Sequence, residues 1–159
     1  MIVLIDVDLA RADHAAAVTE LTSRYARDPM GGGQDLSAEV KTGLAGRLRA
    51  RPDYFGVLAF DGAVPVALIN CFESFSTFAA RPLMNVHDVY VEPAYRGRGL
   101  SHRLLQRVED AARARGCAKL TLEVLDGNAA ATASYRRFGF ATYALDPAHG
   151  AAQFWQKKL

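Results

Sequence analysis

The most restrictive feature of this sequence is the dipeptide Asp61-Gly62, which lies between two apolar, β-favouring runs at residues 54–60 and 64–72. Asp-Gly between such runs is a strong signal for a tight β-hairpin, because both residues tolerate the positive φ angles that these turns need. A third run of the same character covers residues 84–91. We therefore predict three strands in the middle of the chain, the first two of them antiparallel.

Helical periodicity surrounds these strands. Apolar residues recur at helical spacing in four segments, residues 10–27, 36–48, 101–115 and 129–138. Asn128 is a suitable N-cap for the last helix, and Gly116 and Gly139 stand where the last two helices should end. Further runs of strand character occupy residues 2–7, 119–125, 140–143 and 152–156.

The resulting order, β-α-α-β-β-β-α-β-α-β-β, combines hairpins with strand–helix–strand crossovers. Such a chain forms a mixed sheet, because hairpins pair strands antiparallel and crossovers pair them parallel. We predict an α/β protein (α+β mixed) with a central mixed, mostly antiparallel sheet and helices on both faces. Its 159 residues fit a single domain over 1–159.

Composition excludes several classes of protein. Half of the residues are hydrophobic, 23% are charged and the net charge is +2, too small to favour a nucleic acid or an anionic membrane as partner. The apolar start breaks at Asp6, too early for a signal peptide or a membrane span. Cys71 and Cys117 lack the spacing of a zinc or redox motif, so we expect no metal site and a cytoplasmic location.

The most informative segment for function is residues 89–101, where a strand turns directly into an amphipathic helix. The first amides of a helix have no partner within the helix, and its dipole favours negative charge there. Gly97 and Gly99 let a phosphate approach the backbone, and Arg96 and Arg98 add charge. A Rossmann motif is excluded because His102 takes the place of its third small residue, and a Walker loop because Leu100 follows Gly99.

The run Arg96-Gly97-Arg98-Gly99-Leu100-Ser101 resembles the signature of the GNAT superfamily of N-acyltransferases. That signature is Arg or Gln, two residues, Gly, one residue, then Gly or Ala; Ser101 is the one departure. The resemblance implies the GNAT fold and acetyl-CoA as acyl donor, with the turn amides holding the pyrophosphate of coenzyme A. It implies that the main chain near Val89 and Val91 pairs with pantetheine. The full set of expected coenzyme-binding residues is Val89, Tyr90, Val91, Arg96, Gly97, Arg98, Gly99, Leu100, Ser101 and Asn128.

A second match lies downstream, where Asn128, Ala131 and Tyr135 precede Phe138-Gly139-Phe140 at the spacing that this superfamily uses. The resemblance implies that Asn128 contacts the pantetheine arm and that Tyr135 protonates the departing thiolate. The alternative for Tyr135 is a packing role on the buried face of its helix.

The attacking amine must lose a proton, so the site needs a base. His87 is the candidate, because its ordinary pKa suits neutral pH and alternation along the strand places it on the face of Val89 and Val91. Glu73 is the second choice, and Asp88 or Glu123 is expected to orient the base. The backbone N–H of Val89 is a candidate donor to the oxyanion.

An aromatic and hydroxyl cluster at residues 72–78 has two interpretations, an acceptor pocket or the surface of a homodimer. The sequence as a whole predicts an N-acetyltransferase that acts on a primary amine of a small molecule or peptide. The alternative is a non-catalytic acyl-CoA-binding regulatory module.

Overall fold

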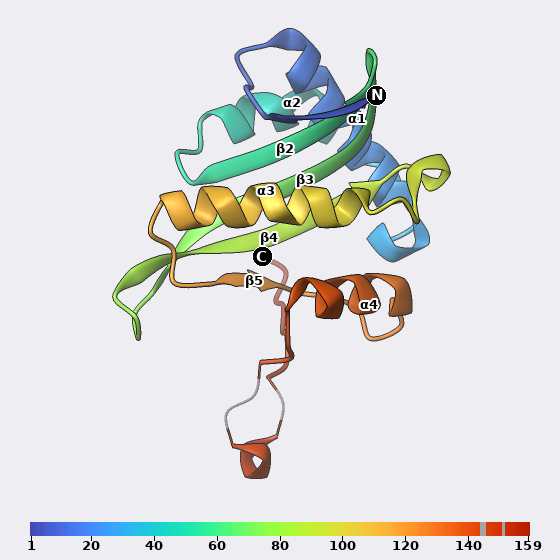
Figure 1. Ribbon diagram of the computed structural model, residues 1–159. Helices are drawn as coiled ribbons and strands as arrows, with labels where there is room; N and C mark the ends of the chain where they lie inside the picture. Colours follow the sequence, from blue (N-terminus) through green and yellow to red (C-terminus); the bar gives the residue numbers. More distant parts are fainter. Residues whose placement is uncertain (144–145, 151) are drawn as a thin grey trace. The chain divides into compact units, whose positions relative to one another are not determined.

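The computed structural model describes residues 1–143, 146–150 and 152–159 (Figure 1). These residues group into two compact units, 1–122 and 123–159, which we describe one at a time. None of the helices in these ranges is both long and apolar enough to cross a membrane.

Within the described ranges, the first unit holds all the strands and three of the four α-helices. Its elements are β1 (Ile2–Asp6), α1 (Ala12–Arg27), the 3-10 turn η1 (Pro29–Gly31), α2 (Ala38–Arg49), β2 (Tyr54–Asp61), β3 (Val64–Ser76), β4 (Arg81–Val91), the 3-10 turn η2 (Pro93–Tyr95), α3 (Leu100–Ala114) and β5 (Leu120–Leu122). The second unit holds α4 (Ala129–Phe138) and the 3-10 turn η3 (Pro147–His149). The helices predicted from periodicity are therefore confirmed, with shifts of a few residues at their ends.

The strands form one sheet in the order β1-β2-β3-β4-β5. The first four are antiparallel to their neighbours, and β5 is parallel to β4 at Met84–Val86. The predicted hairpin at Asp61-Gly62 is confirmed, since Asp61 pairs with Val64 and Gly62 has a φ of 61°. The mixed, mostly antiparallel sheet is confirmed as well.

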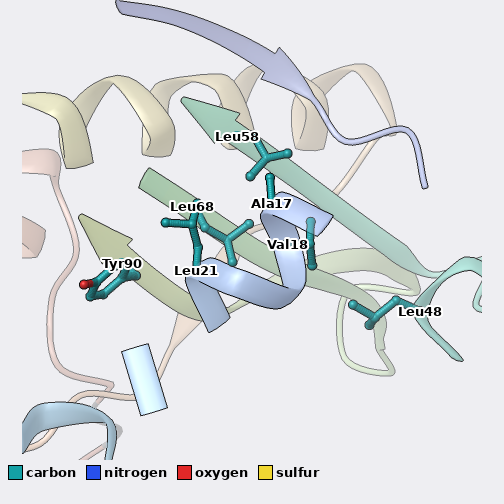
Figure 2. Packing of buried hydrophobic residues seen from close by; sticks show 7 residues of the cluster. All are labelled: Ala17, Val18, Leu21, Leu48, Leu58, Leu68 and Tyr90. Atoms are coloured by element: carbon teal, nitrogen blue, oxygen red, sulfur yellow. The ribbon is translucent and has the colours of Figure 1, made fainter. Parts of the chain in front are cut away.

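The two faces of the sheet are covered by different helices. Val18 and Leu21 of α1 pack with Leu58, Leu68 and Tyr90 of the three central strands on one face (Figure 2). Because side chains alternate along a strand, the neighbouring residues of β2, β3 and β4 point to the other face, across which α3 lies (Figure 1). There α3 buries Leu100, Leu104, Leu105, Val108 and Ala112.

Three strand predictions need correction. Residues 140–143 and 152–156 form no strand, and the run at 119–125 pairs only at Leu120–Leu122. Residues 73–83, for which no strand was predicted, also belong to the sheet, because β3 and β4 continue through them as a hairpin with its turn at residues 77–80. A β-favouring sequence becomes a strand only where a neighbouring edge offers hydrogen bonds, and local composition does not show that edge.

Candidate functional site

The turn between β4 and α3 has the backbone expected of an anion site. Gly97 and Gly99 both adopt left-handed φ values, 74° and 73°, and α3 begins at Leu100 after the N-cap residue Gly99, which has no side chain to cap the first turn. A Cβ atom on either glycine would meet no other atom within 4 Å, so their conformation, not crowding within the chain, requires glycine. The result is an open helix N-terminus whose amides and dipole favour a negatively charged group.

Arg96 stabilises this turn through hydrogen bonds to other parts of the first unit. Its Nε donates to the carbonyl of Val91 at 2.8 Å, and its Nη2 donates to Asp28 Oδ2 at 2.7 Å. The Arg96 guanidinium, followed by the N–H of Met30, holds the pKa of Asp28 below its usual range. The charge of Arg96 is therefore balanced by Asp28, whereas Arg98 lies over the ring of Tyr95 with its guanidinium carbon 5.5 Å from the centroid.

Two more contacts fix the turn to the rest of the first unit. Arg24 of α1 donates to Glu92 at 2.6 Å, and the hydroxyl of Tyr95 donates to Asp61 at 3.2 Å. The turn is thus tied both to the end of α1 and to the β2–β3 hairpin. Sequence reasoning missed these contacts, because they join residues far apart in the chain.

The last residues of β4 leave one main-chain edge open. Glu92 N–H donates to Val66 O, and by antiparallel alternation the main-chain groups of Val89 and Val91 point away from β3. Among the described residues, β5 pairs with this edge only at Met84–Val86. Val89 and Val91 therefore present main-chain groups at this edge, although the Val91 carbonyl already accepts from Arg96.

Tyr90 differs from its neighbours Val89 and Val91 in where its side chain and its main chain lie. Its side chain is buried in the core on the α1 face, and its main chain belongs to the pairing with β3 (Figure 2). The remaining members of the expected coenzyme-binding set in this unit, residues 96–101, all lie in the turn or the first turn of α3.

His87 does not lie on the strand face that alternation predicts. Asn70 pairs with Asp88 but Cys71 pairs with Val86, so His87 is the extra residue of a β-bulge. Its ring meets the edge of Phe72 at 5.5 Å between centroids, and Phe72 packs against the α1 side of the sheet. The prediction that His87 shares a face with Val89 is therefore wrong, because the bulge interrupts the two-residue period.

Asp88 lies on the α1 face, two residues before Tyr90, and two further polar side chains meet it there. Tyr54 Oη donates to Asn70 Oδ1 at 2.9 Å, and Asn70 Nδ2 donates to Asp88 Oδ2 at 3.0 Å. Neither Tyr54 nor Asn70 was predicted from the sequence as a site residue. The one signal for Asn70 is its polar side chain within the otherwise apolar run 64–72.

Glu73, the second candidate for the base, lies near Arg115 and on the opposite face of the sheet from His87. Its carboxylate lies 3.7 Å from Arg115, just beyond the end of α3. Because Phe72 points to the α1 face, its neighbour Glu73 points to the α3 face, away from His87.

The second unit contains the downstream motif. Asn128 caps α4, its Oδ1 accepting from the N–H of Ala131 at 3.1 Å, and Gly139 ends the helix at a φ of 111°. Tyr135 is partly buried, and its ring meets the edge of Phe140 at 6.0 Å. Both helix-end predictions are confirmed. Glu123 also belongs to this unit.

Comparison with known proteins gives the following matches. The model of the acetyltransferase (GNAT) family matches residues 17–140. L-methionine sulfoximine/L-methionine sulfone acetyltransferase of Pseudomonas aeruginosa is 32% identical over 118 residues, which cover 71% of this chain and 69% of that protein. Streptothricin acetyltransferase of Streptomyces lavendulae is 40% identical over 77 residues, 48% of this chain but only 41% of that protein. A crystallised aminoglycoside N-acetyltransferase in complex with CoA shares the fold, with a TM-score of 0.75, 13% identity and coverage of 100% of this chain and 96% of that one.

Proposed function

The chain belongs to the acetyltransferase (GNAT) family, and we propose that it transfers the acetyl group of acetyl-CoA to a primary amine of a small molecule or peptide. The observation that carries this proposal is the open N-terminus of α3 behind two left-handed glycines. Two relatives are named as acetyltransferases, one of streptothricin and the other of L-methionine sulfoximine and L-methionine sulfone. A structural neighbour contains CoA.

The turn residues supply the coenzyme site in this proposal. The amides from Arg98 to Ser101 bind the pyrophosphate, and Arg98 contributes a positive charge. We assign Arg96 a supporting role, since its guanidinium is held by Asp28 and the Val91 carbonyl. The open main-chain edge at Val89 and Val91 then takes the pantetheine arm as a neighbouring strand would.

His87 and Asp88 form the amine side of the proposed site. An amine attacks a thioester only as the free base, so His87 accepts its proton directly or through water. The bulge exposes His87 and holds it beside Phe72. The N–H of Val89, two residues further on, is the proposed donor to the oxyanion that forms from the carbonyl.

Tyr135 is the proposed general acid, and Asn128 is proposed to contact the pantetheine arm while capping α4. Departure of coenzyme A leaves a thiolate, which a phenol within hydrogen-bond reach stabilises or protonates. The support comes from family membership and from the shared helix that carries both residues.

We further infer that the protein forms a homodimer in the cytoplasm, where free thiols such as Cys71 and Cys117 stay reduced. The proposed dimer surface is the tip of the β3–β4 hairpin. It carries Phe75 and Phe78, whose side chains are 60% and 99% exposed. Exposed aromatic side chains of this kind are often covered by a partner.

Replacing Gly99 with Val tests the coenzyme site. The new side chain occupies the space that a phosphate needs, so the affinity for coenzyme A in calorimetry should fall at least about tenfold, which is 1.4 kcal/mol. Gly116→Val is the matched control, because Gly116 has the same φ of 73° at the other end of α3 and equally open surroundings. Equal affinities in the two variants would show that the turn is not the coenzyme site.

Replacing Tyr135 with Phe separates catalysis from packing. The ring is kept and only the hydroxyl is lost, so binding of acetyl-CoA should stay near normal while the chemical step slows about 10²–10⁴-fold. Tyr143→Phe serves as a control from the same unit. Wild-type turnover in Tyr135→Phe, measured where chemistry limits the rate, would leave only the packing role.

Sedimentation velocity tests the dimer. Wild-type protein should sediment as a dimer, and Phe78→Ser should shift it toward the monomer because the exposed ring no longer contributes apolar surface. Val64→Ser, at the exposed start of β3, should leave the dimer intact. A monomer at every accessible concentration of the wild type would rule out this surface as a dimer interface.

A further inference from the structure

A chain of three polar side chains crosses the central strands on the α1 face of the sheet. Tyr54 of β2 donates to Asn70 of β3, which donates to Asp88 of β4, at 2.9 and 3.0 Å. Asn70 is only 3% exposed, and a buried amide is costly unless its polar atoms are bonded. The amide therefore has its orientation fixed, with its oxygen toward Tyr54 and its nitrogen toward Asp88.

Gly56 makes room for this arrangement. It pairs with Asn70 across β2 and β3. A Cβ atom at this position would lie 2.4 Å from Tyr54 Oη and 2.9 Å from Val7 Cγ2. Only glycine therefore lets the Tyr54 phenol lie across β2 and reach Asn70.

Asp88 is the β4 end of the chain of hydrogen bonds. It is partly buried, and no cationic side chain among the described residues forms an ion pair with it. Two arginines that lie over rings of this face, Arg96 over Tyr90 and Arg51 over Phe72, form ion pairs elsewhere, Arg96 with Asp28 and Arg51 with Asp53. The Asp88 carboxylate therefore keeps its negative charge available.

Several aromatic side chains lie on the same face of the sheet as this carboxylate. Tyr54 meets Phe72 at 5.8 Å between ring centroids, and His87 meets Phe72 at 5.5 Å. Tyr25 also lies on this face, with its ring centroid 6.0 Å from that of Tyr90, and burial, followed by the charge of Asp88, raises the pKa of its phenol. A negative group among aromatic faces attracts a cation and repels an anion.

We propose that Tyr54 and Asn70 are positioning residues that hold the Asp88 carboxylate toward the acceptor, and that the acceptor is an amine without a carboxylate on its amine-bearing carbon. This inference rests on the proposed function, because it takes His87 and Asp88 as the acceptor side of the site. An ammonium group beside Asp88 is attracted, whereas the carboxylate of an α-amino acid is repelled at almost the same distance. The proposal thus predicts that the protein favours side-chain and alkyl amines over the α-amines of free amino acids.

A matched pair of probes tests this. Norleucine is n-pentylamine with a carboxylate added on the carbon that bears the amine. NMR titration of the wild-type protein saturated with coenzyme A should give n-pentylamine at least about tenfold tighter binding than norleucine. Asp88→Asn should reduce this preference to near one.

Variants of the two positioning residues complete the test. Tyr54→Phe and Asn70→Leu should each lower the preference for n-pentylamine several-fold while leaving the affinity for coenzyme A unchanged. Asn85→Leu is the control, because Asn85 bonds Thr121 across β4 and β5, away from Asp88. If Asn70→Leu does not fold, Tyr54→Phe, which keeps its ring, still decides the outcome.

The inference is overturned if wild-type protein binds both probes equally or neither, or if Tyr54→Phe keeps the full preference. A purely structural role for Tyr54 and Asn70 would lower the melting temperature without changing the preference. A preserved preference without acetyl transfer would instead contradict only the proposed function.

Discussion

The antiparallel pairing of β3 with β4 is the constraint on which the candidate site depends. It runs from the Ala67–Val91 pair to the Ser76–Arg81 pair and is interrupted once, at His87. Because the pairing fixes which main-chain groups of β4 face β3, it also leaves Val89 and Val91 at the open edge. The interruption turns His87 toward the α1 face, which Asp88 shares with Tyr90 by alternation. One strand thus presents main-chain groups at its edge and side chains on its α1 face.

Contacts from distant parts of the first unit hold the end of β4 in place. Arg96 joins the turn to Asp28 at the end of α1, and Arg24 joins α1 to Glu92. An anion site made of backbone amides needs a fixed backbone, since free amides lose entropy when they converge on a ligand. The ion pairs of Arg96 and Arg24 reduce this loss of entropy, because they hold the backbone of the turn in place before a ligand binds. This explains why Arg96, although part of the motif, contacts Asp28 and the Val91 carbonyl.

Local chemistry accounts for what could be predicted from the sequence. The Asp61-Gly62 hairpin, the glycine turn before α3 and the Asn128 cap each depend on a few neighbouring residues, and all three were predicted. The face of His87 was not, because a bulge depends on how two strands pair. The partners of Arg96 and Asn70 also join different elements, and one sequence does not show such contacts. The roles of Tyr135 and His87 remain predictions.

The central claim is that the protein catalyses acetyl transfer and does more than bind the coenzyme. Release of free thiol from acetyl-CoA, followed across a panel of small-molecule amines, aminoglycosides, amino acids and peptides, tests it most directly. Our account predicts thiol release that depends on the presence of one class of amine and is stoichiometric with the acetylated product. Tight binding of acetyl-CoA with no amine-dependent thiol release across the panel would contradict it and favour a non-catalytic acyl-CoA-binding module.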